Sequence, residues 1–401
     1  MSMRPLEGYR VFDFTVAKSG PICTKILADF GAEVIHVEQP GKPDPTRKMK
    51  PTFQNTSSEY ACHNSGKKNI NLNMKIPESR TLAYRIIEKC DIFVENGKPG
   101  SAAKLGLGYE DVRAVRPDII YASISGFGQT GPYRDRAAFD TVIQAMSGFM
   151  SLTGPASGEF TKAGPSISDI FTAYVTALGI AMAVIRKSRT GEGTYLDAAM
   201  LDCMIPMMDC AVAAYLNAGQ ERRPIGNAHP ANCIAEPVRC KDGEFILQMF
   251  GEEQHKRFFQ VMGMPDLTQD ERFCDGPHRV ENRQTLIREY VEPVLANYTL
   301  AEISKLLRDN KLPFGEMNTI AQMTQDAHVN FRGAFIPCHD TLGGELKITG
   351  SPFKFSNFEM PRETFCAAPG EHNVAVAREL AGMQDEEIKN IFAKMGVDVV
   401  L

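Results

Sequence analysis

The N-terminal region alternates between strand and helix patterns over a short distance. Residues 9–15 and 33–38 are rich in apolar and β-branched side chains, and residues 21–30 between them have a helical pattern that ends at Gly31. A strand, a crossover helix and a second strand this close together form a right-handed βαβ unit. The sequence therefore predicts a parallel sheet covered by helices.

The same alternation continues through the N-terminal half of the chain. Further strands are expected at residues 70–74, 91–95, 119–125 and 194–197, and helices at residues 78–89, 102–115, 140–149, 170–187 and 198–216. Alternation of this kind predicts an α/β fold with a doubly wound, Rossmann-like sheet. Ser168 is the expected N-cap of the helix at residues 170–187.

The pattern changes in the second half of the chain. A hairpin followed by helices predicts a smaller α+β domain. The strands and helices after it are expected to return to the first domain, so that both chain ends build the large domain. The expected boundaries are a large domain at residues 1–200, a linker helix at 201–224, the small domain at 225–315 and a return segment at 316–401.

Composition narrows the classes of partner. The chain has 44 basic and 49 acidic residues, a net charge of −5, which argues against a general electrostatic grip on nucleic acid or an anionic membrane. The first residues contain no apolar secretory segment, and the longest apolar stretch, residues 171–185, is too short to span a bilayer. We therefore expect a cytoplasmic protein with no nucleic-acid or membrane partner.

Cysteine and histidine spacing gives no metal motif. The ten cysteines are scattered, with no CxxC pair and no histidine at zinc-ligand spacing, and the histidines form no HExxH motif. This pattern is typical of reduced, mostly buried thiols. We therefore expect neither a disulfide framework nor a metal site.

The first turn between strand and helix contains Lys18 and a single glycine before a proline. A dinucleotide-binding turn needs GxGxxG here, and the chain also lacks GxxxxGK[ST], so NAD, FAD and P-loop nucleotide binding are disfavoured. The turn still lies at the carboxyl end of a strand, where open α/β sheets bind ligands. Lys18 and the N–H groups of the helix start are candidates for binding an anion, the alternative being a surface lysine in a tight turn.

Asp169 lies in the first turn of an otherwise apolar helix. Backbone N–H groups and the helix dipole favour its ionised form, and an ionised, partly desolvated carboxylate is a competent nucleophile toward an activated acyl carbon. Aspartate is also common in first helical turns for structural reasons alone. The residue pattern by itself leaves both interpretations open.

Two further segments have the composition of anion-binding loops. Residues 125–133 contain three glycines after a strand and are followed by Arg134 and Arg136, and residues 63–68 end in two lysines. Either segment could hold a phosphate or a carboxylate. The alternatives are simple turns and solvated surface cations.

Read together, these segments resemble the class III CoA transferases over nearly the whole chain. The motifs that carry the resemblance are PLEGYRVFDFT, GPICTKILADFGAEVIHVEQPG, NSGKKNINLNMK, DIFVENGKPG, LGLGYEDVRAVRPDIIYASISGFGQTGPY, FDTVIQAMSGFMSLTG, SISDIFTAYVTALGIAMAVIRKSRTGEGTYLDAAMLD, GNAHP, PFKFSNFE and GEH. The resemblance implies an interlocked ring homodimer with no permanently bound cofactor, for which coenzyme A and acyl-CoA are substrates.

The resemblance also implies a reaction. In this family an aspartate at the start of the long helix attacks a donor acyl-CoA to form a mixed anhydride, the CoA thiolate returns to give an aspartyl-CoA thioester, and an acceptor acid takes the CoA. The matching residue is Asp169. The implied function is CoA transfer from an acyl-CoA thioester to a free carboxylic acid.

Other positions carry over as contacts of CoA or the acyl group. They are Lys18, Ser19, Leu72, Asn73, Met74, Lys75, Asn96, Gly97, Lys98, Lys104, Arg136, Ala137, Phe139 and Asp140. Lys18 stands where the formyl-CoA transferase has a glutamine. Lys104 stands where it has an arginine, so a point charge replaces a planar phosphate-binding group. The family's glycine-rich gating loop corresponds to residues 251–254, where one glycine is left.

The expected acceptor is a small dicarboxylate such as oxalate or succinate. The candidates for recognising it are Lys18, Arg47, Arg134 and Arg136. One alternative function is an acyl-CoA racemase or epimerase of the same fold, whose base histidine corresponds to Phe139, a residue that cannot abstract a proton. The other is a non-catalytic CoA-binding protein.

Overall fold

The largest sheet in the computed structural model, which describes residues 3–53, 56–341 and 343–401, has six strands. They are β1 (Arg10–Phe14), β2 (Glu33–Glu38), β5 (Lys68–Asn71), β6 (Ile92–Glu95), β7 (Ile120–Ser125) and β8 (Thr194–Ala199). Their order is β5-β2-β1-β6-β7-β8, and every neighbouring pair is parallel. The predicted α/β class with a parallel sheet is therefore confirmed, and the direction of strand addition reverses between β1 and β6.

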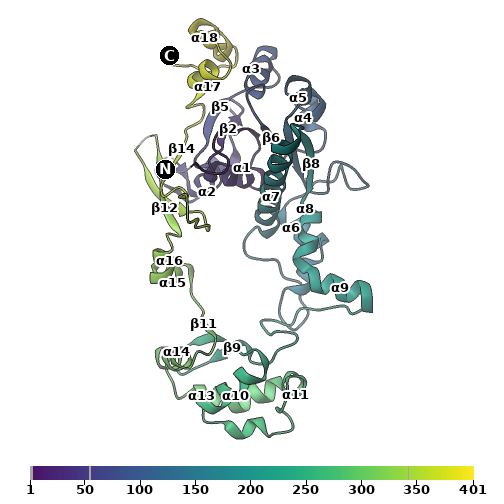
Figure 1. Ribbon diagram of the computed structural model, residues 1–401, viewed down its shortest axis with the longest axis vertical. Helices are drawn as coiled ribbons and strands as arrows, with labels where there is room; N and C mark the ends of the chain where they lie inside the picture. Colours follow the sequence, from purple (N-terminus) through teal and green to yellow (C-terminus); the bar gives the residue numbers. More distant parts are fainter. Residues whose placement is uncertain (1–2, 54–55, 342) are drawn as a thin grey trace. The chain divides into compact units, whose positions relative to one another are not determined.

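Helices cover both faces of this sheet (Figure 1), because apolar side chains alternate along its strands. On one face Phe93 stacks between Phe12 and Tyr121, with ring centroids 5.2 and 4.6 Å apart. This core cluster includes residues of α3 (Pro77–Ile87), α5 (Tyr109–Val115), α17 (Asn373–Glu379) and α18 (Asp385–Lys394). The last two helices come from the C-terminal segment, so segments from both ends of the chain pack on this sheet.

The opposite face is covered by α1 (Ser19–Asp29) and α7 (Ile167–Thr190), whose buried residues share a second core cluster with Val11 and Ile92. Helix α7 has 24 residues and extends beyond both ends of the range predicted for it. Within the described residues it is the one helix long and apolar enough to cross a membrane by length and composition, and the apolar stretch at residues 171–185 is only part of it. Its inner face packs on the sheet and on α1, as a core helix does.

Shorter elements surround this sheet. They are η1 (Pro45–Lys48), β3 (Thr52–Phe53), β4 (Thr56–Ser57), α2 (Ser58–Asn64), α4 (Ser101–Lys104), α6 (Asp140–Met146), α8 (Met200–Met204), η3 (Ile205–Met208), α9 (Asp209–Ala218), β12 (Phe335–Asp340), β13 (Glu345–Thr349) and β14 (Thr364–Cys366). The helix predicted at residues 198–216 is interrupted by η3, because Pro206 has no backbone N–H. Strands β13, β12 and β14 form a separate small sheet.

A second antiparallel sheet, with the order β11-β10-β9, has its own core. The elements of this part are β9 (Ala235–Arg239), β10 (Glu244–Gln248), α10 (Gly251–Val261), η4 (Pro265–Thr268), α11 (Gly276–Glu281), α12 (Arg283–Thr285), η5 (Leu286–Val291), α13 (Glu292–Leu295), α14 (Leu300–Asp309), β11 (Phe314–Glu316) and α15 (Ile320–Gln325). Phe245, Phe258 and Phe273 are fully buried in its core cluster. Helices η2 (Phe149–Leu152) and α16 (Ala327–Phe331) lie where the chain passes from one part to the other.

The chain therefore divides into two units. The first consists of Met1–Phe149, Ala163–Gln220 and His328–Leu401, and the second of Met150–Lys162 and Glu221–Ala327. The observed boundaries differ from the predicted ones. Residues 150–162 leave the large unit because Gly154 O accepts a hydrogen bond from Gly226 N at 2.9 Å. Most of the predicted linker helix stays with the large unit, because α8 packs against α7, and the second unit runs on through α15.

A buried ion pair joins β1 to the helices beside it. The ammonium of Lys67 is fully buried and donates to Asp13 Oδ2 (3.0 Å), Asn64 Oδ1 (2.7 Å) and Pro21 O (2.9 Å). Burial acts to raise the pKa of the Asp13 carboxyl, but Lys67 and His36 outweigh it and hold that pKa well below its usual range. The pair is therefore charged within the fold.

This placement corrects the interpretation of residues 63–68 as an anion-binding loop. Lys67 points into the core, and Lys68 pairs at the surface with Glu33 at 2.6 Å. A lysine is almost never fully buried unless it is paired, and its partner Asp13 is distant in sequence. Local composition therefore could not reveal the burial.

Removing one partner of this pair should destabilise the protein strongly. We expect Lys67→Met to lower the free energy of unfolding by about 3–5 kcal/mol, because an uncompensated carboxylate is left buried. The neighbouring change Lys68→Met removes a half-exposed pair and should cost no more than about 1 kcal/mol. Urea denaturation of the two variants measures the difference, and equal losses would contradict the assignment of the buried pair.

Candidate active site

The reversal of strand order between β1 and β6 brings two turns together at the carboxyl ends of these strands. Asn96, directly after β6, accepts a hydrogen bond from Val16 N (2.9 Å) and donates one to Val16 O (2.8 Å). Gly20 permits this approach, because a Cβ there would lie 2.9 Å from Asn96 Cγ. In open α/β sheets the crevice at such a switch point is where ligands bind.

The backbone just before Lys18 is strained. Ala17 has a φ of 66°, which costs a residue with a Cβ about 1 kcal/mol. Its N–H donates to Asp44 Oδ2 (2.8 Å), and its carbonyl accepts from His63 Nδ1 (3.2 Å). Burial and the Lys18 cation lower the pKa of His63 to about 4, so the ring is neutral and carries its proton on the donating nitrogen. Two packed side chains thus hold the backbone from which Lys18 extends.

Asp169 lies in the first turn of α7, where backbone N–H groups lack helical partners. The helix begins at Ile167, so the prediction of Ser168 as its N-cap is wrong. Ser168 N and Oγ instead donate to Asp140 Oδ1, at 2.9 and 2.7 Å. Gln144 donates to the other oxygen of Asp140 at 2.7 Å. These bonds fix a second carboxylate beside the start of the helix.

The surroundings of Asp169 raise the pKa of its carboxyl to about 6. Burial is the main cause and the Asp140 carboxylate adds to it, whereas the Lys18 ammonium acts in the opposite direction. At neutral pH the half-buried carboxyl is therefore mostly ionised. A carboxylate that has lost part of its hydration can attack an activated acyl carbon.

The ammonium of Lys18 lies between two elements that are distant in sequence. It donates to Ser166 Oγ, at the N-cap of α7, at 3.2 Å and pairs with Glu59 on α2 at 3.0 Å. The Lys18 side chain keeps 27% of its surface exposed, so it is accessible to a ligand. The structure therefore places the predicted cation close to Asp169.

The loop after β7 carries the predicted arginines. Arg136 lies over the ring of Tyr133, 4.5 Å from its centroid, and Arg134 lies against Gly100, close to the turn that follows β6. Phe139, at the N-cap of α6, is 76% exposed. Both arginines are exposed, so their charges are available at the surface of this loop.

The remaining predicted CoA contacts are of two kinds. The side chains of Leu72 and Met74 are buried in the core, so that only their backbone can face a ligand. Lys75, Lys98 and Lys104 are exposed in the segments that follow β5 and β6. These three lysines supply mobile cations suited to phosphate groups.

Four predicted positions have other local roles. Ser19 is buried at the start of α1, and Ala137 is exposed. Asn73 Oδ1 accepts a hydrogen bond from the backbone of Lys75 at 3.1 Å, and Gly97 N donates to Glu95 Oε2 at 2.8 Å. These contacts shape the turns.

Two expectations for this region are not met. Arg47 donates to Glu38 at 2.9 and 3.0 Å, to Tyr60 Oη at 2.5 Å and to Ala367 O at 3.0 Å, so it ties β2 to the C-terminal segment and is not free to recognise an acid. Residues 251–254, the expected gating loop, form the first turn of α10 in the second unit. These residues are therefore helical and do not form a loop.

Sequence reasoning missed the residues that position Lys18 and Asp169. Glu59 lies on α2, a short helix that was not predicted, although Ser57 before it is typical of an N-cap. Gln144 donates to Asp140 one turn away on the same helix, an i,i+4 spacing that the sequence does show. Ser166 and Asp44 instead act through tertiary contacts with residues far along the chain. Spacing in the sequence carries no signal for such contacts.

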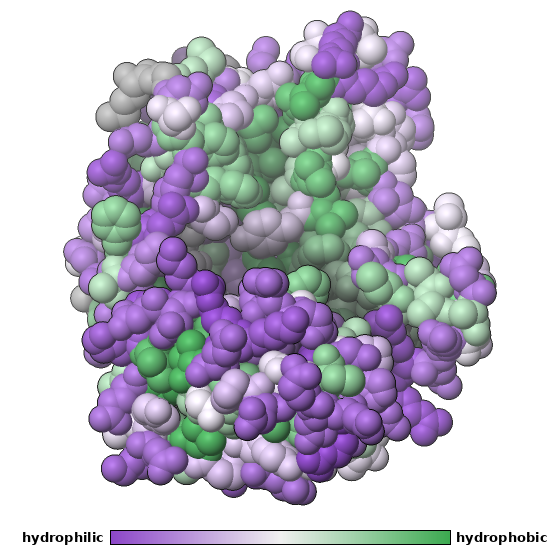
Figure 2. Space-filling model, turned by 60° about the horizontal axis from the view of Figure 1, so that its bottom comes forward, coloured by the Kyte–Doolittle hydropathy of each residue, from purple (hydrophilic) through white to green (hydrophobic). Residues whose placement is uncertain are grey.

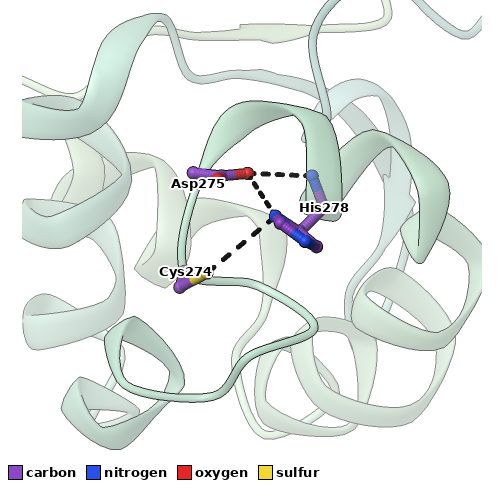
Figure 3. A group of neighbouring side chains, drawn as sticks. All are labelled: Cys274, Asp275 and His278. Carbon is purple, nitrogen blue, oxygen red and sulfur yellow. Dashed lines mark hydrogen bonds and ion pairs between the residues drawn. The ribbon is translucent and has the colours of Figure 1, made fainter.

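A separate group of possible metal ligands lies in the second unit. Cys274, Asp275 and His278 bring their donor atoms within 4.8 Å of one another (Figure 3). This group was not singled out from the sequence, in which Cys274 and His278 are four residues apart. Only the common zinc-site and HExxH spacings were compared with the sequence, and neither covers ligands in the first turn of a short helix such as α11.

Comparisons with known proteins identify the family of the chain. The model of CoA-transferase family III matches residues 6–373. A succinate–glutarate CoA-transferase from Agrobacterium fabrum is 34% identical over 383 residues, which cover 94% of this chain and 96% of the relative. A succinyl-CoA:glutarate CoA-transferase from Mus musculus is 32% identical over 395 residues, which cover 97% and 89%.

A solved structure supports the same assignment. The crystal structure of a CAIB/BAIF family protein from Brucella suis superposes with a TM-score of 0.85 at 32% identity, covering 94% of this chain and 100% of the other. The match of the family model and the relatives extends over nearly the whole chain. The chain therefore belongs to CoA-transferase family III and is an enzyme that moves CoA from an acyl-CoA thioester to a free carboxylic acid.

Proposed function

We propose that this enzyme takes CoA from succinyl-CoA and passes it to a small dicarboxylic acid through covalent intermediates on Asp169. The observation that carries the proposal is the half-buried carboxylate of Asp169 at the start of α7, with a pKa of about 6 and the Lys18 cation beside it. The names of the relatives from Agrobacterium fabrum and Mus musculus, both containing glutarate, support the choice of substrates.

The proposed reaction is a sequence of four acyl transfers. An Asp169 oxygen attacks the thioester carbon of succinyl-CoA, the C–S bond breaks, and CoA thiolate leaves a mixed anhydride. The thiolate then attacks the Asp169 carbonyl carbon, which releases succinate and gives an aspartyl-CoA thioester. The acceptor carboxylate attacks this thioester and expels the thiolate. Finally the thiolate attacks the acceptor's carbonyl carbon, forming the new acyl-CoA and restoring the Asp169 carboxylate.

Lys18 has the position and charge to select a dicarboxylate. One carboxyl group of a small diacid must reach Asp169 to react. The ammonium of Lys18, held by Ser166 and Glu59, lies near Asp169. The second carboxylate can then pair with Lys18 in a partly desolvated site, where a charged hydrogen bond is stronger than in water. A monocarboxylic acid has no group for this contact.

The proposed CoA site is the crevice at the switch point of the sheet. The turn at Asn96, Gly97 and Lys98 lies there, with Lys75 and Lys104 as additional exposed cations for the phosphates. The other expected contacts are Ser19, Leu72, Asn73, Met74, Arg136, Ala137, Phe139 and Asp140. CoA is a substrate in this proposal, with no permanently bound cofactor.

We also propose an interlocked homodimer in the cytoplasm, without nucleic-acid or membrane partners. Apolar patches on one face of the molecule (Figure 2) are consistent with an interface. Helix α7 in addition exposes a stripe of apolar side chains at helical spacing: Tyr174, Leu178, Met182 and Ile185. The ten cysteines, all within the described residues, form no disulfide with one another, as is usual in a reducing compartment.

Replacing the nucleophile tests the proposal. We expect Asp169→Asn to lower the rate of CoA exchange between succinyl-CoA and glutarate by roughly 10³-fold or more, with CoA binding retained, because an amide oxygen is a poor nucleophile. Asp111→Asn is the matched control, since Asp111 occupies the same third position of α5 and is exposed. The control should keep nearly full activity.

The two alternative functions predict other activities for the unchanged protein. A racemase would exchange the α-proton of a 2-methylacyl-CoA in deuterated water, although Phe139 stands where a base would be needed. A non-catalytic protein would bind CoA without any exchange. Exchange by Asp169→Asn at a rate close to that of the unchanged enzyme would rule out the covalent route.

The pH dependence of kcat/KM should follow the ionisation of the Asp169 carboxyl group. Below its pKa of about 6 the group is protonated and cannot attack, so kcat/KM for succinyl-CoA should rise with pH up to about 6 and then level off. Lys18→Met removes the cation that lowers this pKa, and the rising limb should move to higher pH. A limb that stays in place in this variant would contradict the proposed coupling.

Acid selectivity should depend on Lys18. We expect Lys18→Met to raise KM for dicarboxylates about 10- to 100-fold and to change KM for a monocarboxylate much less, because one charged hydrogen bond is lost. Lys98→Met should instead raise KM for the acyl-CoA. Steady-state kinetics with glutarate and butyrate measure both effects. An equal increase in KM for the two acids would show that Lys18 does not bind the second carboxylate.

A further inference from the structure

The second unit contains three side chains of different chemistry that converge on one point (Figure 3). Cys274 precedes α11, Asp275 is the N-cap of this helix, and His278 lies in its first turn. His278 Nδ1 lies 4.0 Å from Cys274 Sγ and 2.7 Å from Asp275 Oδ1. One ring nitrogen therefore faces both the sulfur and the carboxylate.

This geometry does not suit a catalytic triad. A triad needs the histidine to contact the nucleophile through one ring nitrogen and the carboxylate through the other. Here Nδ1 makes both contacts, at 4.0 and 2.7 Å. Convergence of sulfur, nitrogen and oxygen on a common point is instead the arrangement in which a cation is chelated.

The donor set selects the kind of metal. Thiolate, imidazole and carboxylate together bind Zn²⁺, with bond lengths of about 2.0–2.3 Å. Tetrahedral angles then put neighbouring donor atoms roughly 3.3–3.7 Å apart, between the N–O distance of 2.7 Å and the S–N distance of 4.0 Å found here. To reach these separations the sulfur must approach the ring nitrogen and the carboxylate oxygen must move away from it, each by roughly 0.3–1 Å, which the exposed Cys274 and the half-exposed side chains of Asp275 and His278 allow.

The frame around the group is already ordered. Asp275 Oδ1 accepts the backbone N–H of His278 at 3.0 Å, which fixes the turn, and Cys274 Sγ donates to Glu271 O at 3.4 Å. Nearby cations are engaged elsewhere: Arg272 pairs with Asp270 at 2.7 Å, and Arg279 pairs with Glu252. The two arginines therefore leave the donor group open to a cation.

We propose that Cys274, Asp275 and His278 form a Zn²⁺ site, separate from the CoA-transfer chemistry, that clamps the start of α11. Zn²⁺ takes the Cys274 thiolate, the Nδ1 of neutral His278 and one Asp275 oxygen. Binding releases the thiol proton to solvent and moves the imidazole proton from Nδ1 to Nε2. A fourth position stays open to water, which gives a site of moderate affinity rather than a closed structural one.

The test measures Zn²⁺ binding to the full chain by competition with a chromogenic chelator. We expect one equivalent of Zn²⁺ to bind, and both Cys274→Ser and His278→Gln to weaken this binding about tenfold or more. Cys210→Ser is the matched control because Cys210 is the other exposed cysteine, and it should leave the affinity unchanged. Co²⁺ in place of Zn²⁺ should give a thiolate-to-metal charge-transfer band that Cys274→Ser abolishes.

A second readout uses the unchanged protein. Zn²⁺ should slow the alkylation of Cys274 but not that of Cys210, as followed by peptide mass spectrometry, and a chelator should restore the rate. Equal affinity in Cys274→Ser and the unchanged protein, or equal protection of both cysteines, would overturn the site. CoA exchange is expected to be the same with and without Zn²⁺, so the result does not depend on the proposed function.

Discussion

The buried pair of Lys67 and Asp13 is the interaction on which the geometry of the active site depends. Asp13 lies near the end of β1, and its carboxylate also accepts hydrogen bonds from Thr15 at 2.5 Å and from Thr24 on α1 at 2.7 Å. Desolvation of these charges is expensive and is offset only because each has several partners at short range. The network fixes where the chain leaves β1, and so where Lys18 begins.

From that point the site is assembled by contacts among elements that are distant in sequence. Asn96 clamps the turn from β6, and Asp44 and His63 hold the strained Ala17. Helix α1 packs against α7, which sets the position of Asp169. Burial and a neighbouring carboxylate make this group more basic, while a lysine and the helix N-terminus keep it ionised at neutral pH. The balance gives a carboxylate that is charged yet poorly hydrated, as a nucleophile requires.

Local patterns predicted the parallel sheet well, because strand and helix periodicity and the βαβ rule act over short distances. The pattern placed Asp169 in a first helical turn, and a family resemblance was needed to give it a role. The start of α7 was misjudged because Ser168 bonds to Asp140 rather than capping the helix. Lys67 was predicted to lie in an anion-binding loop, but it is buried through its tertiary contact with Asp13. The pairing of Glu59 with Lys18 is also a tertiary contact, which the local sequence does not show.

The most direct test of the covalent mechanism is peptide mass spectrometry of the enzyme after incubation with succinyl-CoA and a hydroxylamine trap. An Asp169 acyl intermediate reacts with hydroxylamine and leaves a hydroxamate on the peptide that contains this residue. We predict that the modification is found on Asp169, requires succinyl-CoA and is missing in Asp169→Asn. CoA exchange that proceeds in the unchanged enzyme with no modification at Asp169, or with modification at another carboxylate, would contradict the mechanism.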